Sequence, residues 1–153
     1  MIQVALYQPE IAQNVGNILR TGVCFNIKTH IIRPTGFVIS DKLLKRANAN
    51  YGTEYVLWDD FESFLFHTQS HNLRVLSMTA SADKAICIPY YNMHYAHNDI
   101  IMAGPESCGL ETSVIKKTSA AITIPMYKTD MSLNLATSVG IVLAEVMKQI
   151  NWK

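Results

Sequence analysis

The sequence predicts an α/β domain in which a mostly parallel sheet carries helices on both faces. Short apolar runs alternate with longer amphipathic segments along the chain, which is typical of strands that alternate with helices. The runs consist mainly of apolar residues, as expected of strands that are buried on both faces. A length of 153 residues is that of one domain, so we expect residues 1–153 to form a single domain.

The elements follow one another in a regular order. Strands are predicted at 3–7, 29–32, 56–58, 74–78, 99–103 and 121–124, and helices at 14–25, 41–48, 59–68, 111–117 and 134–149. Apolar residues at helical spacing support the last helix: Leu135, Val139, Val142, Leu143 and Val146. Residues 81–98 hold one proline, three tyrosines and two histidines, and we interpret them as a long irregular connection.

Composition narrows the class of protein. Hydrophobic residues make up 49% of the chain and charged residues only 16%, which excludes a mainly disordered chain and suggests that a second copy covers part of the surface. The net charge of +1, taken alone, argues against a strongly electrostatic nucleic-acid binder.

Three scattered cysteines fit free thiols in the reducing cytoplasm. No apolar run approaches the ~20 residues of a membrane span, and the first residues read as a strand rather than a signal peptide.

Several common sites are not indicated. The sequence has no G-x-G-x-x-G, no P-loop and no G-x-S-x-G, which argues against a standard dinucleotide fold, a P-loop NTPase and a serine hydrolase elbow. His67 and His71 lack the glutamate of H-E-x-x-H, so we expect solvated or capping roles for them rather than a metal site. Asp59 and Asp60 are interpreted as helix-capping residues.

Three segments near predicted strand ends carry a functional signal. Ligands of open α/β sheets bind beyond the carboxyl ends of strands, which directs attention to the loops after Tyr7, Met78, Ala103 and Ile124. The segments read NVGNILR at 14–20, GPESCGL at 104–110, and IPM at 124–126 followed by SLNL at 132–135. Alone, each has an ordinary structural explanation, such as Asn14, Ser132 or Asn134 capping a helix.

Together and in this order, the three segments resemble motifs 1, 2 and 3 of the SpoU branch of the SPOUT superfamily, which are S-adenosylmethionine-dependent RNA ribose 2′-O-methyltransferases. The opening VALYQPEI and the stretch DKLLKRA at 41–47 are most similar to the minimal members that methylate the wobble nucleotide, a cytidine or uridine, of tRNA. The sequence departs from that group at Ala103, Ala144 and Asn50.

The resemblance implies a fold, a cofactor and an assembly. The fold is the SPOUT sheet with helices on both sides and a C-terminal trefoil knot. The cofactor is S-adenosylmethionine, which leaves as S-adenosylhomocysteine, and no metal is required. Family members are homodimers whose active site draws on both subunits. The partner molecule is the tRNA anticodon stem-loop.

The resemblance also implies site residues. Cofactor contacts are expected from Met78, Gly104, Ile124, Ser132 and Leu133, and catalytic roles from Arg20, Asn17, Glu106 and Asn134. An arginine is effectively always charged and is a poor general base, so Arg20 is expected to bind the adjacent phosphate and stabilise developing negative charge. Asn17 and Glu106 would hold Arg20 and the loop in place.

Two alternatives stay open at this stage. One is the same reaction on ribosomal RNA, and the other is a catalytically silent RNA-binding α/β domain. The charge distribution favours an RNA partner, because residues 20–46 contain six of the 13 basic residues and only one of the 12 acids. RNA contacts are expected from Arg20, Lys42, Lys45 and Arg46.

Overall fold

The described residues form one seven-stranded parallel sheet. The structure is a computed structural model of the chain, and it describes residues 1–40, 55–80, 87–128 and 131–150. The strands are β1 (Gln3–Tyr7), β2 (Lys28–Ile32), β3 (Tyr55–Trp58), β4 (Arg74–Met78), β5 (Cys87–Pro89), β6 (Asp99–Ala103) and β7 (Ala120–Thr123). They lie in the order β3-β2-β1-β6-β4-β7-β5, and each recorded pairing is parallel.

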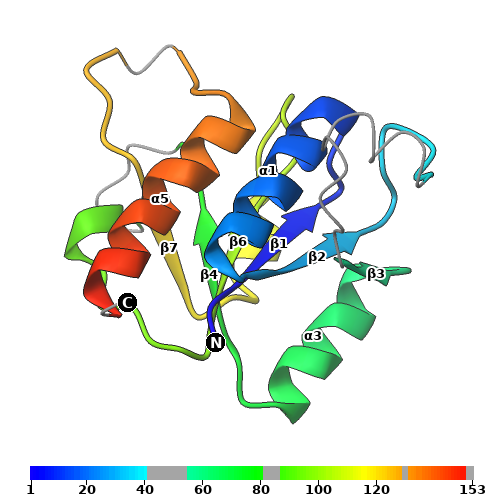
Figure 1. Cartoon of the computed structure of the whole chain (residues 1–153), viewed down its shortest axis with the longest axis horizontal. Coiled ribbons are helices and arrows are strands. Elements are labelled where there is room, and N and C mark those ends of the chain that lie inside the picture. Colours follow the sequence, from blue (N-terminus) through cyan, green and yellow to red (C-terminus); the bar gives the residue numbers. More distant parts are fainter. Residues whose placement is uncertain (41–54, 81–86, 129–130, 151–153) are drawn as a thin grey trace.

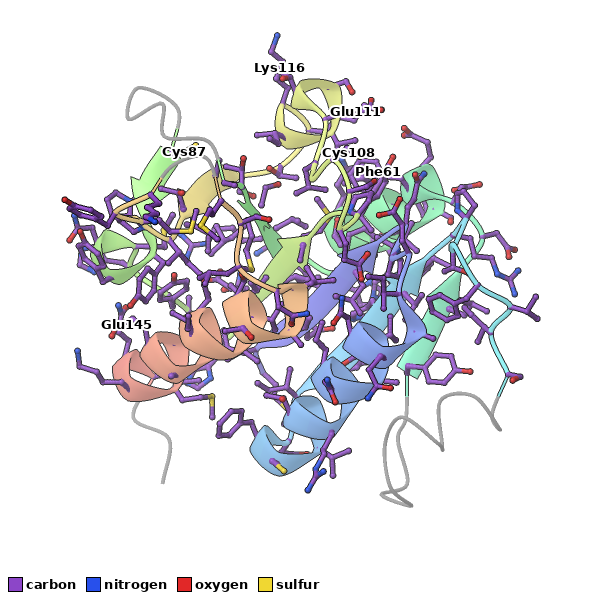
Figure 2. The ribbon with its side chains drawn as sticks, turned by 90° about the horizontal axis from the view of Figure 1, so that it is seen from above. Phe61, Cys87, Cys108, Glu111, Lys116 and Glu145 are labelled. Carbon is purple, nitrogen blue, oxygen red and sulfur yellow. The ribbon has the colours of Figure 1, made fainter. Side chains whose placement is uncertain are left out.

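Helices cover both faces of this sheet. α1 (Ala12–Phe25) and α5 (Leu135–Gln149) lie side by side across one face (Figure 1). α3 (Phe61–Ser70) and the single turn α4 (Thr112–Ile115) lie on the other face, where Figure 2 shows Phe61 and Lys116. A short 3₁₀ turn, η1 (Tyr90–Asn92), contacts α5. None of the described helices is long and apolar enough to cross a membrane.

Alternate residues of the central strands pack into two separate hydrophobic cores, one on each face of the sheet. Val4 and Leu6 of β1 pack with the buried faces of α1 and α5, whereas Ala5, between them, packs in the cluster that contains Phe64 of α3. Successive side chains of a strand point to opposite faces, so a sheet covered on both sides can bury every residue of a central strand. Asp99–Ala103 of β6 is accordingly buried along its whole length.

The predicted elements agree closely with the structure. Strand boundaries are confirmed to within one residue, and the helix predicted from residue 59 begins two residues later. Asp60 is the residue before that helix, and its Oδ1 accepts a hydrogen bond from the Ser63 backbone N–H at 2.8 Å. The capping role of Asp60 is therefore confirmed, while Asp59 pairs with Arg33 at 2.8 Å instead of capping.

One predicted segment differs from the structure, and another lies outside the residues that the structure describes. Residues 81–98 are not wholly irregular, since they contain β5 and η1. The helix predicted at 41–48 lies outside the described residues. The single domain and the C-terminal trefoil knot stay predictions.

His30 links three strands through its buried imidazole, which is 0% exposed. Its Nδ1 accepts a hydrogen bond from Trp58 Nε1 of β3 at 3.0 Å, so its Nε2 is left to donate to Gln3 Oε1 of β1 at 2.6 Å. Burial, together with smaller contributions from the charges of Lys28 and His67, lowers the pKa of His30 to about 4. The imidazole is therefore neutral in the folded protein at neutral pH.

Acid is expected to weaken the fold through His30. The unfolded chain takes up a proton at this side chain below pH 6.5, but the folded chain does so only near pH 4, so the contribution of His30 is complete above pH 6.5 and is lost as the pH falls to 4. This loss corresponds to roughly 3 kcal/mol. We expect His30→Gln, which keeps a donor and an acceptor without titrating, to show a shallower decline of urea stability between pH 7 and 4. Identical pH dependence in both proteins would contradict this assignment.

Candidate functional site

A cavity of about 540 Å³ opens at the carboxyl edge of the sheet. It lies where β4, β6 and β7 end and where α1 and α5 begin. The order of the sheet places β6 between β1 and β4, with β7 next to β4, so segments distant in sequence converge there. All five predicted cofactor-contact residues line this one cavity: Met78, Gly104, Ile124, Ser132 and Leu133.

The four predicted catalytic residues are divided between two places. Glu106 and Asn134 line the cavity. Asn17 and Arg20 are exposed one turn apart on α1, and neither is among the cavity-lining residues described for this chain. The three other predicted RNA contacts, Lys42, Lys45 and Arg46, lie outside the described residues.

The Glu106 carboxylate accepts hydrogen bonds from residues at the N-terminus of α1. One carboxylate oxygen accepts from the backbone N–H of Glu10 at 2.8 Å, and the other accepts from the N–H of Ile11 at 3.3 Å and from Asn14 Nδ2 at 2.9 Å. Ile11 precedes α1 and offers no side-chain cap of its own. Glu106 therefore supplies the acceptor and the negative charge that a helix N-terminus favours.

Asn14 connects the first and third sequence motifs and is only 5% exposed. Its Nδ2 donates to Glu106 at 2.9 Å, while its Oδ1 accepts from Asn134 Nδ2 at 2.8 Å. Asn134 in turn caps α5, because its Oδ1 accepts from the N–H groups of Ala136 and Thr137. The capping role considered for Asn134 is thus confirmed, whereas Asn14 lies in the first turn of α1 and reaches across to two other loops.

Sequence reasoning gave Asn14 only a capping role and did not assign it to the site. The signal that could have found it is its place as the first residue of NVGNILR, directly after a predicted strand end. Of the two asparagines of this motif, Asn14 lines the cavity, whereas Asn17, which the resemblance assigned to the site, is not among the lining residues described.

The 104–110 loop is folded tightly on itself. A methyl group on Gly104 would lie 2.6 Å from the Leu110 nitrogen and 2.7 Å from the Gly109 carbonyl carbon. Gly109 has a φ of +68°, the left-handed conformation that glycine adopts without strain, and its N–H donates to the Pro105 carbonyl at 2.9 Å. Every residue from 104 to 110 lines the cavity, so this turn sets the shape of one wall.

The cavity combines apolar walls with a small number of polar side chains. Much of its wall is apolar, with contributions from Leu110, Ile122, Ile124 and Val142, and polar side chains such as Asn14 and Asn134 lie at the helix entrances. Among the described lining residues the ionisable side chains are those of Glu106 and Cys108, and Glu106 is already committed to three donors. The described part of the chain holds no group of three or more His, Cys, Asp or Glu suited to a metal ion.

Comparison with known proteins identifies full-length relatives. The SpoU rRNA Methylase family matches residues 1–144. A "tRNA (cytidine(34)-2'-O)-methyltransferase" of Beijerinckia indica subsp. indica is 33% identical over 152 residues, covering 96% of this chain and 91% of the relative.

Solved structures share the fold. One, described as "Structural insights into the 2-OH methylation of C/U34 on tRNA", has a TM-score of 0.90 and 35% identity, and covers 100% of this chain and 98% of its own. The AviRb methyltransferase of Streptomyces viridochromogenes, solved with AdoMet, has a TM-score of 0.84, covering 100% of this chain and 61% of its own. Its identity is only 16%, so it supports the fold alone.

The close approach of the Leu110 backbone to Gly104 leads to a prediction about stability. We expect Gly104→Ala to lower the free energy of unfolding by roughly 1–3 kcal/mol, because the added methyl meets backbone atoms that cannot move aside without opening the turn. Urea denaturation measures the difference.

A matched control is Gly140→Ala in α5. A Cβ at Gly140 meets no atom within 4 Å, so the same substitution there should be neutral or stabilise the helix by up to ~1 kcal/mol. Equal unfolding midpoints for Gly104→Ala and the unaltered protein would show that the 104–110 turn is not packed as described.

Proposed function

The chain belongs to the SpoU rRNA methylase family, and from this membership we propose that it transfers a methyl group from S-adenosylmethionine to the ribose 2′-hydroxyl of the wobble nucleotide, cytidine or uridine, of tRNA. The observation that carries the proposal is identity of 33% to 35%, over nearly the whole chain, to relatives described in terms of that same tRNA position. The converging motif loops supply a cavity for the reaction.

The residues around the cavity fit an adenosine-containing cofactor. A volume of about 540 Å³ is within the range of ligand pockets, and apolar walls from separate loops suit the two faces of a purine. Met78, Gly104, Ile124, Ser132 and Leu133 would hold the cofactor, with backbone groups of their loops available to the edge of the base. When bound, S-adenosylmethionine supplies a methyl group on a positively charged sulfur, whose loss leaves a neutral thioether.

The protein's task is therefore alignment and charge stabilisation. A neutral leaving group needs no general acid, and aligning the ribose hydroxyl with the methyl group can lower the barrier by several kcal/mol. Glu106, Asn14 and Asn134 fix the loops and helix starts that surround the cavity. Arg20 is proposed to bind the neighbouring phosphate and to stabilise the negative charge that develops on the hydroxyl oxygen, with the proton passing to phosphate or water.

We propose that Arg20 acts on the cavity of a second copy. Arg20 and Asn17 lie on the exposed surface of α1 and outside the cavity lining described for their own chain. A homodimer would bring this surface of one protomer to the site of the other, and would cover part of a chain with only 16% charged residues. It would also present two basic stretches to an anticodon stem-loop in the cytoplasm, with Lys42, Lys45 and Arg46 as further contacts.

Methyl transfer to bulk tRNA tests the function. The full-length protein is incubated with tRNA and cofactor labelled in the methyl group, and the tRNA is digested to locate the labelled nucleotide. Label at the wobble ribose is expected. Label elsewhere in tRNA, or in ribosomal RNA but not tRNA, would overturn the wobble assignment. Cofactor binding without transfer to any RNA would favour the silent binding domain.

Substitution of Arg20 tests its role. Arg20→Ala should reduce turnover by roughly 100-fold or more, because an electrostatic contact to the reacting oxygen is lost, while calorimetry should find cofactor affinity nearly unchanged. Lys116→Ala is the control, since Lys116 follows α4 on the opposite face (Figure 2). Near-normal turnover of Arg20→Ala would contradict the role.

Mixed dimers test whether Arg20 acts across subunits. Arg20→Ala and Glu106→Gln protomers, each of low activity alone, are unfolded together and refolded. If Arg20 serves the partner's cavity, a random mixture should recover about a quarter of normal activity, because half of the dimers contain one intact site of two. No recovery would show that Arg20 and Glu106 must belong to the same chain.

A further inference from the structure

Reciprocal hydrogen bonds join the loop that precedes α1, at Glu10, to the 104–110 loop that lines the cavity. Glu106 accepts from the backbone N–H of Glu10 at 2.8 Å. In return, the Glu10 carboxylate accepts from the backbone N–H of Ser107 and from its hydroxyl, each at 2.7 Å. The Ser107 bonds lower the pKa of the Glu10 carboxyl below its usual value, so Glu10 is charged at neutral pH and engaged by both donors.

The backbone at Glu10 also packs against the backbone at Gly36. The Gly36 N–H donates to the Pro9 carbonyl at 2.9 Å. A Cβ at Gly36 would lie 2.8 Å from the Glu10 Cα, so the two backbones are in direct contact. The backbone of Glu10 is therefore held in place by its neighbours, and its side chain, although it lies at the surface, hydrogen-bonds to the 104–110 loop.

We infer that Glu10 is a positioning residue for the cofactor: it holds Ser107, and through it the 104–110 loop, in the conformation that binds S-adenosylmethionine. The inference rests on the proposed function and adds to it a residue outside the three motifs. Every residue of that loop lines the cavity, so a looser loop must be ordered again each time the cofactor binds, and this ordering lowers affinity.

A different explanation makes a separable prediction. Glu10 is a carboxylate near a site for a positively charged sulfur, so simple charge attraction could also favour the cofactor. Attraction of that kind would not extend to S-adenosylhomocysteine, whose sulfur is neutral, and would disappear in Glu10→Gln. Positioning depends on hydrogen bonds, so it should act equally on both ligands and should survive in Glu10→Gln, whose amide can accept from the Ser107 N–H and donate to its hydroxyl.

Calorimetric titration with each of the two ligands tests the inference. Glu10→Ala should weaken both by roughly five- to tenfold, because two hydrogen bonds to an exposed carboxylate are lost. Glu10→Gln should stay within about twofold of the unaltered protein. Glu10→Asp keeps the charge but is one methylene too short, and should resemble Glu10→Ala. Ser107→Ala, which removes only the hydroxyl, should weaken both ligands by about twofold.

The control is Glu62→Ala, which removes an exposed carboxylate that pairs with Lys117 on the helical face opposite α1 and α5. It should leave both affinities unchanged. Thermal unfolding of each ligand-free variant is measured beside the titrations, and hydrogen exchange at residues 106–109 should be faster in Glu10→Ala than in Glu10→Gln.

Three results would overturn the inference. These are unchanged S-adenosylhomocysteine affinity in Glu10→Ala, equal weakening in Glu10→Gln and Glu10→Ala, or equal weakening in Glu62→Ala. If the unaltered protein binds neither ligand, the proposed function itself fails. If it binds both and the Glu10 variants match it, only the positioning role fails.

Discussion

The site depends on one buried amide. Asn14 is 5% exposed and uses both ends of its side chain, donating to Glu106 and accepting from Asn134. Each partner also binds backbone N–H groups at a helix entrance: Glu106 at α1 and Asn134 at α5. A buried amide that lost one of these partners would carry the cost of an unsatisfied polar group. The two helices and the 104–110 loop are therefore held in one relative arrangement.

This arrangement is possible because of the order of the sheet. Parallel strands all end at the same edge, and the central position of β6 places the 104–110 loop beside both the β1–α1 connection and the end of β4. The apolar cores on both faces hold these strands from either side. Rigid strands and a self-packed glycine turn leave the loops little freedom, which suits a reaction whose barrier is lowered mainly by alignment.

Local sequence predicted the elements well and the contacts between them poorly. A strand buried on both faces is a mainly apolar run, so β1, β4 and β6 were predicted with the bounds observed. β5 was missed because it is three residues long, ends in a proline, and lies at the sheet edge within a segment rich in tyrosine and histidine. Likewise, the strand ends and the motifs located five of the residues that line the cavity, but the partners of Asn14 are 92 and 120 positions away. No local pattern records such contacts.

The first motif illustrates why one segment can serve two purposes. Helical periodicity places residues three or four apart on adjacent parts of one face, and in α1 it turns Asn14, Ile18 and Leu19 inward while Asn17 and Arg20 are exposed. The inward residues build the cavity of their own chain and the core beneath it. The outward pair lies where a molecule approaching from outside, whether RNA or a second copy, can reach it. In the proposed dimer, the spacing of this motif on one helix would therefore couple a chain's own pocket to a surface that completes the pocket of its partner.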